Sequence, residues 1–351
     1  MKNTFVPEPV AEGENRAERR SLKENVVGIS SRCVAVVGLL LGTIPCWSSA
    51  VAAANWPHRA VRLIAPVPAG TASDFSARLF AERLSQRWGQ PVIVENRPGA
   101  DGVIGVSAFL STDDDHTLLY AISAVFTVLP ITHAKLPYDP VRDLVPISPT
   151  SDVVLAIAAT EKQSIRSLDD LVRTARAQPG KLNWASSPGL PPLVVGGFFK
   201  NSKLDLALIS YRDLAPALQD IGEGRIDIFI HALGVIMPQV RSGRARLLAI
   251  SGDVRAPLAP DVPTVTEAGF PELRMDGVVG FFGKRGMSDT LRDRIASDVR
   301  AVANDPVIGE RLAAVGQAAH PGTAAEFAAL LDEYHRRLAD LAKTIDFKAT
   351  Q

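Results

Sequence analysis

Cysteine is scarce in this chain, and none of it lies in the part that we expect to fold. The two cysteines, Cys33 and Cys46, both fall within the first 54 residues. Residues 55–351 therefore contain neither a disulfide framework nor a cluster of thiolate metal ligands. Without such cross-links, the stability of this part has to come from the burial of a hydrophobic core.

The sequence also lacks the signatures of common catalytic and nucleotide-binding sites. Its six histidines are scattered, and none forms an HxxxH or HExxH pair. A Gly-x-Ser-x-Gly elbow, a Walker-type phosphate loop and a complete Gly-x-Gly-x-x-Gly after a strand are all missing. The acidic run at 113–115 is typical of a solvated turn, because the ligands of an EF-hand alternate with other residues. We therefore expect no enzyme, no cofactor and no metal site.

Charge of the two signs is balanced, with 38 basic and 38 acidic residues. The first 54 residues hold six of the basic and five of the acidic ones, which leaves 32 basic and 33 acidic residues beyond them. A net charge near −1 argues against nucleic acid or an anionic lipid surface as the partner.

The first 54 residues are predicted to be an export leader. Their apolar core, CVAVVGLLLGTI, carries no charge and is short for a membrane span of about 20 residues. A small-x-small pattern at 50–52 predicts cleavage near Ala52–Ala54 and a periplasmic mature protein. Three alternatives stay open, namely a start at Val26 or Val27, twin-arginine export through RRSLK, and an uncleaved anchor.

Expected strands and helices alternate after the leader, which is typical of an α/β fold with parallel sheets. Thr71-x-x-Asp74 and Ser167-x-x-Asp170 have the spacing of a capping box that opens a helix. Expected strands are 61–66, 92–95, 117–122, 154–158, 183–185, 206–210, 226–230 and 246–250, and expected C-terminal helices are 289–304, 306–315 and 324–345.

The length of the folding part is typical of two domains, because roughly 300 residues are too many for one small core. Two irregular segments rich in proline, 136–152 and 257–283, are interpreted as crossings between the domains. They divide the chain into an N-terminal part, a middle domain and a C-terminal return.

Two loops rich in glycine and proline are the strongest functional signal. Residues 66–71 follow the first expected strand, 97–102 follow the second, and both loops run into a helix. Unpaired N–H groups at helix N-termini favour anions, and loops at the carboxyl ends of parallel strands are where open α/β sheets bind ligands. The segment SSPG at 186–189 leaves a strand in a matching way. The alternative is an ordinary strand-to-helix turn at each place.

These motifs resemble those of the Bug-type solute receptors of tripartite tricarboxylate transporters (TctC-like). PVPAGTASDFSAR at 66–78 is similar to the family pattern P-F-P-A-G-G-x-x-D-x-x-A-R, and ENRPGADGVIG at 95–105 is similar to E-N-R-P-G-A-x-G-x-I-G. LPYDP at 136–140 and PDVPTVTEAG at 260–269 match two further motifs. The resemblance covers the whole chain beyond the leader.

The resemblance implies a two-lobed, type II (Venus flytrap) fold like that of periplasmic binding proteins, with a mixed or parallel sheet in each lobe. Lobe 1 would comprise 55–148 and 276–351, and lobe 2 would comprise 149–275. The implied function is capture of a small organic acid outside the cytoplasm, without catalysis, by a monomer that delivers it to membrane permease subunits. The acid could be a di- or tricarboxylate, an aromatic acid or an amino acid. A sensor for a membrane kinase, a secreted hydrolase and a structural envelope protein are the alternatives.

Carried over by position, the resemblance also implies a set of ligand-binding residues. Asp74 is expected to cap the first helix and shape its loop as well. The implied residues are Pro68, Gly70, Thr71 and Asp74 in the first loop, Ala100 and Gly102 in the second, Ser123 and Thr127 after the third strand, and Ser186, Ser187 and Gly189 in the middle domain.

The sequence departs from the family pattern at several of these places. Thr71 stands where a second glycine is usual, and Leu190 and Leu193 replace a serine and a histidine in the middle-domain loop. His231 occupies a place often held by an acidic residue. Our hypothesis is that His231 faces the cleft and favours an anionic group as the pH falls through its range; the alternative is a strand-end histidine without a ligand role.

Overall fold

The computed structural model describes residues 56–345 with four single-residue gaps. Every described residue belongs to one compact unit, 49–351. The expected leader and its cleavage site lie outside the described residues. None of the helices within the described part has the length and apolar character needed to cross a membrane. The gaps are residues 188, 212, 253 and 276.

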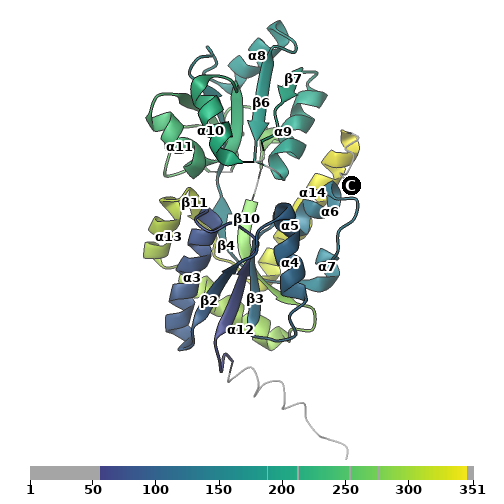
Figure 1. Cartoon of the computed structure of the whole chain (residues 1–351), viewed down its shortest axis with the longest axis vertical. Coiled ribbons are helices and arrows are strands. Elements are labelled where there is room, and N and C mark those ends of the chain that lie inside the picture. The colour runs from purple at the N-terminus through teal and green to yellow at the C-terminus, as the bar shows by residue number, and fades with distance from the viewer. Residues whose placement is uncertain (1–55, 188, 212, 253, 276, 346–351) are drawn as a thin grey trace, which may run out of the picture. The chain divides into compact units, whose positions relative to one another are not determined.

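Two mixed β-sheets, each with helices on both faces, make up the described chain (Figure 1). The first sheet has the strand order β11-β4-β10-β3-β1-β2, and the second has the order β7-β6-β8-β5-β9. Strands β1, β2 and β3 run parallel, whereas β10 lies antiparallel between β3 and β4. The strands are β1 Val61–Ala65, β2 Val92–Asn96, β3 Thr117–Ile122, β4 Leu144–Val153, β5 Leu155–Thr160, β6 Leu182–Ser186, β7 Leu206–Leu208, β8 Ile228–Ala232, β9 Ala245–Ile250, β10 Gly277–Lys284 and β11 Gln317–Ala319.

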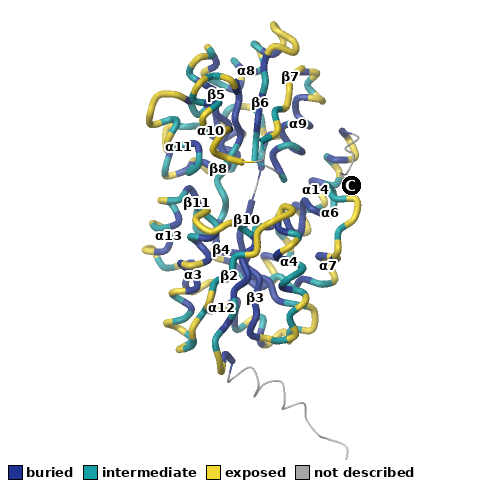
Figure 2. The backbone as a smooth tube through the Cα atoms, in the orientation of Figure 1, coloured by how far each residue is buried: buried dark blue, intermediate teal, exposed yellow. Residues whose placement is uncertain are grey.

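The first sheet is buried on both faces by helices. One face packs against α3, α12 and α13, and the other packs against α4, α5 and α14. The apolar residues of β1 and β3 point alternately into these two cores, so both strands are almost fully buried (Figure 2). The helices are α3 Ala72–Trp88, α4 Val103–Leu110, α5 Ala124–Thr127, α12 Asp289–Ala303, α13 Pro306–Ala313 and α14 Ala324–Thr344.

The second sheet is covered in the same manner. Helices α8 and α9 pack on one face, and α10 and α11 pack on the other. All six residues of β5 are buried in the middle of this arrangement. The helices are α8 Leu168–Ala177, α9 Leu190–Asn201, α10 Leu214–Glu223 and α11 Leu233–Arg241; short turns of helix are α6 Leu129–Thr132, α7 Pro140–Asp143, η1 Ala100–Gly102 and η2 Pro271–Leu273.

The C-terminal helix α14 belongs to both cores. Its first half, with Phe327 and Leu331, packs on the first sheet. Its last turns, with Leu338 and Ala342, and Ile345 just beyond them pack with α8 and α9 on the second sheet. The chain passes from the first sheet to the second after Val153 and returns between β9 and β10. The lobe boundaries expected at 149 and 275 stay a prediction.

The interpretation of 136–152 and 257–283 as irregular throughout is wrong for β4 and β10. Both are long strands of the first sheet, and they pair with each other along most of their length. β4 carries Pro146 and Pro149, which have no N–H to give to a ladder. The register between β4 and β10 shifts twice, and each shift adjoins one of these prolines. The two prolines made β4 look irregular in the sequence, and the structure accommodates them in the strand through β-bulges.

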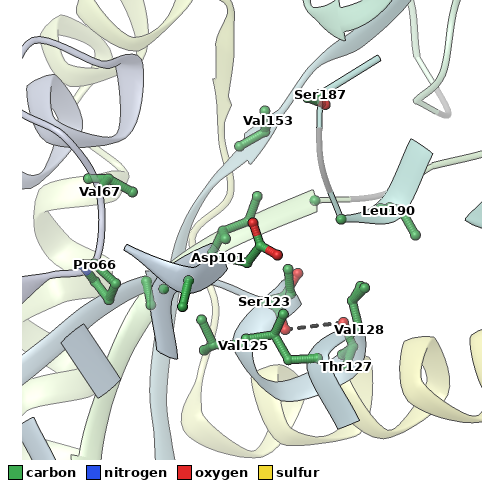
Figure 3. A pocket seen from close by; sticks show the side chains of 18 of the residues that line it. Pro66, Val67, Asp101, Ser123, Val125, Thr127, Val128, Val153, Ser187 and Leu190 are labelled. Carbon is green, nitrogen blue, oxygen red and sulfur yellow. Dashed lines mark hydrogen bonds between the residues drawn. The ribbon is translucent and has the colours of Figure 1, made fainter. Parts of the chain in front are cut away.

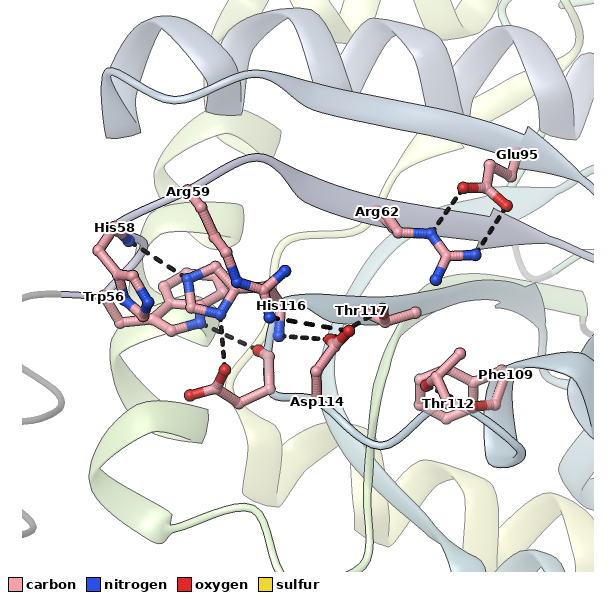
Figure 4. Close-up of polar contacts among 11 residues, drawn as sticks. Trp56, His58, Arg59, Arg62, Glu95, Phe109, Thr112, Asp114, His116 and Thr117 are labelled. Atoms are coloured by element: carbon pink, nitrogen blue, oxygen red, sulfur yellow. Dashed lines mark hydrogen bonds and ion pairs between the residues drawn. The ribbon is translucent and has the colours of Figure 1, made fainter.

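The beginning of the described chain is held against the start of β3 by the acidic run that we interpreted as a turn (Figure 4). Trp56 Nε1–H donates to the carbonyl of Asp115 at 3.0 Å, and the N–H of His58 donates to Nε2 of the fully buried His116 at 3.2 Å. His116 Nδ1 lies 2.6 Å from a carboxylate oxygen of Asp115, and the His116 N–H donates to Asp114. Two of these bonds lie within the turn, and the other two attach the beginning of the described chain to it.

Gly280 in β10 offers a test of the packing between the first sheet and α14. A Cβ at this position would lie 2.6 Å from Phe327 Cζ and 2.7 Å from the carbonyl oxygen of Ser148. We expect Gly280→Ala to lower the free energy of unfolding by about 1–3 kcal/mol, because buried atoms have to shift. Urea denaturation of the variant and the parent measures this difference.

Gly309 is the matched control because it lies inside α13 with open space around its Cβ position. Gly309→Ala should raise stability by about 0.5–1 kcal/mol, since alanine restricts the unfolded chain and favours helix. Equal effects of the two substitutions would contradict the packing described here.

Candidate functional site

A cavity of about 520 Å³ lies where loops from both sheets meet. The first sheet contributes 66–68 after β1, 98–102 after β2 and residues within 121–129 at the end of β3; the second contributes residues within 187–191 after β6. These are the carboxyl ends of parallel strands, where α/β sheets bind ligands. The lining residues are Pro66, Val67, Pro68, Pro98, Gly99, Ala100, Asp101, Gly102, Ala121, Ile122, Ser123, Ala124, Val125, Thr127, Val128, Leu129, Val153, Leu155, Ser187, Gly189, Leu190, Pro191 and Gly277.

The cavity gathers many of the residues that the sequence pointed to. Ser186 lines an adjoining cavity of about 280 Å³, which shares Asp101, Ser187 and Gly189 with the first. The predicted residues that line the larger cavity are Pro68, Ala100, Gly102, Ser123, Thr127, Ser187 and Gly189. Gly70, Thr71, Asp74 and His231 line neither of these two cavities, so direct contact of these four with a ligand stays a prediction.

The first loop satisfies some of its polar groups internally. The N–H of Gly70 donates to Asp74 Oδ2 at 2.9 Å, so this amide is already engaged. Thr71 Oγ1 accepts from the N–H of Asp74 and donates to the carbonyl of Pro68. The expected capping box is therefore shifted, because the carboxylate returns to residue 70 and not to 71. Thr71 has an ordinary φ of −74°, so a side chain fits here without strain.

Asp74 ties this loop to α3 and β2. The residue is only 4% exposed, and its carboxylate accepts hydrogen bonds from Arg78 at 3.1 Å and from Asn96 Nδ2 at 2.8 Å, besides Gly70. Asn96 Nδ2 also donates to the carbonyl of Val67, which lines the cavity. Burial alone would raise the pKa of Asp74, but the hydrogen bonds from Arg78, Gly70 and Asn96 outweigh it and lower the pKa.

The second loop is a left-handed turn of four residues. Gly99, Ala100, Asp101 and Gly102 have φ values of 125°, 46°, 53° and 103°. The turn closes with a hydrogen bond from the Gly102 N–H to the Gly99 carbonyl at 3.0 Å. Ala100 and Asp101 are side-chain-bearing residues in a region that glycine prefers, and such strain often occurs at binding sites.

Glycine beyond this turn lets the first two loops approach closely. A Cβ at Gly105 would lie 2.7 Å from both the Pro66 Cβ and the carbonyl oxygen of Arg97. A Cβ at Gly102 would lie 3.3 Å from Pro66 and 3.4 Å from Val125 Cγ1. Pro66, Gly102 and Val125 can form this part of the wall because Gly102 and Gly105 have no side chain that would push the two loops apart.

Hydroxyl groups supply neutral donors on the cavity wall (Figure 3). Ser123 Oγ accepts from the N–H of Val278 at 3.2 Å, which leaves its own proton free to donate. The proton of Thr127 Oγ1 is engaged, because this hydroxyl donates to the carbonyl of Ser123. Ser187 has a hydroxyl without a hydrogen-bond partner among the described residues, and only its N–H is used, by the carbonyl of Ile230.

Asp101 is the one charged side chain among the described residues that line this cavity. The sequence prediction missed it, although it stands between Ala100 and Gly102, which were both named. Figure 3 shows its carboxylate among the lining side chains. It is 44% exposed, and its nearest basic group is His133 Nε2 at 3.9 Å, beyond hydrogen-bond distance.

The remaining wall is mainly apolar. Leu190, which replaces a serine of the family pattern, lines the cavity from the first turn of α9. Leu193 is fully buried in the core on the second sheet and lines only the adjoining cavity. The sequence did not indicate Val153 and Leu155, because their place depends on where the chain crosses between the sheets.

His231 lies in β8, and its ring stacks on Phe229 at 5.5 Å. Its Nδ1 accepts from the N–H of Ala232 at 2.8 Å. Burial lowers the pKa of His231 from 6.5 to about 4. The side chain is thus neutral near pH 7, and the hypothesis that it favours an anionic group stays a prediction.

Comparisons with known proteins agree on one family. The sequence profile described as "Tripartite tricarboxylate transporter family receptor" matches residues 76–347. A protein of the UPF0065 group from Bordetella bronchiseptica is 33% identical over 324 residues, which cover 92% of this chain and 95% of that protein. "Protein BugT" of Bordetella pertussis is 33% identical over 247 residues, which cover 69% and 76%. The solved structure of R. palustris Rpa4515 with adipate is similar with a TM-score of 0.75 and 26% identity, covering 84% of this chain and 100% of that one.

Substitution of Asp74 tests its role in holding the first loop. We expect Asp74→Asn to lower the free energy of unfolding by about 1–3 kcal/mol at pH 7, because hydrogen bonds to a buried carboxylate are weakened. The folded-state pKa lies below the usual 3.8, so this contribution is present above that pH and is lost as the pH falls through the folded pKa. Thermal melts across the acidic range should show the difference from the parent shrinking. The exposed Asp332→Asn serves as control, and an equal loss there would refute the assignment.

His231 should oppose folding in mild acid. Its pKa is lower in the folded chain, so stability is full above pH 6.5 and falls as the pH drops toward about 4. We expect His231→Asn to remove up to about 3 kcal/mol of this loss, at about 1.4 kcal/mol per pKa unit. Urea midpoints of parent and variant at several pH values measure it. Parallel pH profiles for the two proteins would show that the histidine does not titrate as described.

Proposed function

Because the chain belongs to the receptor family of tripartite tricarboxylate transporters, we propose that it captures a small organic acid and delivers it to the membrane subunits of such a transporter. Proteins of this family are substrate-binding receptors, so the chain is a binding protein and not an enzyme. Its fold is the two-lobed type II fold of periplasmic binding proteins. The alternative of a secreted hydrolase is thereby wrong.

The cavity at the carboxyl ends of β1, β2, β3 and β6 is the observation that carries the proposal. Its free donors include the hydroxyls of Ser123 and Ser187 and the N–H groups of Ala100 and Ala124, for which the described residues provide no acceptor. Uncharged donors of this kind can hold a carboxylate without a positively charged side chain. The similar Rpa4515 was solved with adipate, which is a carboxylate.

Ligand capture would work through closure of two lobes, at the expected boundaries 55–148 with 276–351 and 149–275. A ligand that touches Ser123 from the first sheet and Ser187 from the second favours the state in which both walls are near. The differential affinity for that state drives the closure, and a transporter subunit can then distinguish the loaded receptor from the empty one.

The site of action would be the periplasm. The predicted leader, with cleavage near Ala52–Ala54, would direct export, and the similar solved structures include one described as a periplasmic transporter. We propose a monomeric mature protein that meets its permease subunits at the outer face of the cytoplasmic membrane.

A thermal-shift screen against a library of organic acids tests the proposed function. An acid at 100 times its dissociation constant should add about 2.7 kcal/mol of stability. Ser187→Ala should weaken the binding of that acid about fivefold, which corresponds to about 1 kcal/mol for one hydrogen bond. Its melting temperature without ligand should stay unchanged, because its hydroxyl has no partner among the described residues.

Ser85→Ala is the matched control, since Ser85 is a half-buried serine in α3 outside the cavity. It should leave the affinity unchanged. A library without any stabilising acid would refute the receptor function, and equal effects of the two serine variants would remove Ser187 from the site.

A further inference from the structure

The charge on the cavity wall bears on which acids can bind. Among the described residues that line the cavity, the charged side chain is Asp101, and no arginine, lysine or histidine is present. The free donors named above are neutral hydroxyls and amides. A dicarboxylate would therefore bring two negative charges into a cavity that already holds one, without a described cation to compensate it.

The carboxylate of Asp101 is open to a ligand. It lines both cavities, and it accepts no hydrogen bond from the described residues. His133, the nearest base, stays 3.9 Å away on the side of the smaller cavity. An ionised carboxylate is a strong acceptor, and an ammonium group brings three donors that suit it.

The size and character of the cavity limit the rest of the ligand. A volume of about 520 Å³ with Val125, Val128, Leu155 and Leu190 in its wall suits a short apolar chain. A carboxylate would accept hydrogen bonds from the neutral donors, and a cationic amine would meet the opposite charge of Asp101. The apolar chain between them would cover the apolar wall.

We propose that Asp101 makes this receptor select acids that carry a cationic amine at the end remote from the carboxylate, in preference to dicarboxylates. This inference rests on the proposed function, because it concerns the ligand of the same cavity. Asp101 acts in it as a specificity-determining residue. The similar Rpa4515 was solved with adipate, a dicarboxylate, so the inference sets this receptor's preference apart from that ligand.

Ligand sets matched in carbon number test the inference by calorimetry and thermal shift on protein purified after expression of the full chain. The amino acids are γ-aminobutyrate, δ-aminovalerate and ε-aminocaproate. The dicarboxylates are succinate, glutarate and adipate, and the plain acids are butyrate, valerate and caproate. In the best-fitting set, the parent protein should bind the amino acid at least tenfold more tightly than the dicarboxylate.

Two substitutions of Asp101 separate charge from backbone conformation. Asp101→Asn removes the charge and keeps a residue that tolerates a φ of 53°, whereas Asp101→Gly removes the side chain and relieves the strain. Both should lose at least tenfold in affinity for the amino acid and gain affinity for the dicarboxylate. Asp113→Asn, at an exposed position outside the cavity, should change neither affinity.

Each outcome decides the inference. If the parent binds the dicarboxylate at least as tightly as the amino acid, or if both Asp101 variants keep the parent's preference, the inference is wrong and the receptor function stands. If the wider library of organic acids also fails to stabilise the parent and the two variants, the receptor function itself is wrong. A preference for the amino acid that both variants abolish supports the inference.

Discussion

The buried carboxylate of Asp74 is the interaction on which the shape of the candidate site depends. It collects donors from the loop after β1, from α3 and from the end of β2, and so fixes three segments at one point. Asn96 extends this arrangement to the carbonyl of Val67 on the cavity wall. Some of the donors near the N-terminus of α3, which could have bound a ligand, are thus already engaged in holding the adjacent loop.

Local sequence signals predicted much of the fold. β3 was expected at 117–122 and is found there, and the three C-terminal helices begin at the expected residues, Asp289, Pro306 and Ala324. β4 was missed because Pro146 and Pro149 break the alternating pattern, and the bulged pairing with β10 makes room for them. β10 was missed with it, because it lies in a segment interpreted as irregular. That pairing is a long-range property, which a reading of neighbouring residues does not contain.

The candidate site was predictable at the level of loops but not of individual groups. The glycine and proline pattern located the turns after β1 and β2, and the structure brings both to one cavity. The sequence pattern could not show that the Gly70 N–H donates to Asp74, nor that burial lowers the pKa of His231. Asp101 was not predicted, because its importance comes from its surroundings in the fold. The described residues that line the cavity include no positively charged side chain to pair with it.

Helix α14 has a mechanical consequence for the cavity. Its last turns are embedded beside α9, where Ile345 lies 3.3 Å from the Cβ position of Gly197 and its carbonyl accepts from Lys200. Nearer the start of α14, His335 Nδ1 lies 3.2 Å from the carbonyl oxygen of Thr127. Helix α14 therefore contacts both α5 and α9, and each of these helices contributes residues to the cavity wall. In the proposed opening of the two lobes, we expect α9 either to move along α14 or to lose its contacts with Ile345. These contacts would limit how far the two sheets can separate, and they favour a sliding movement over a hinge rotation.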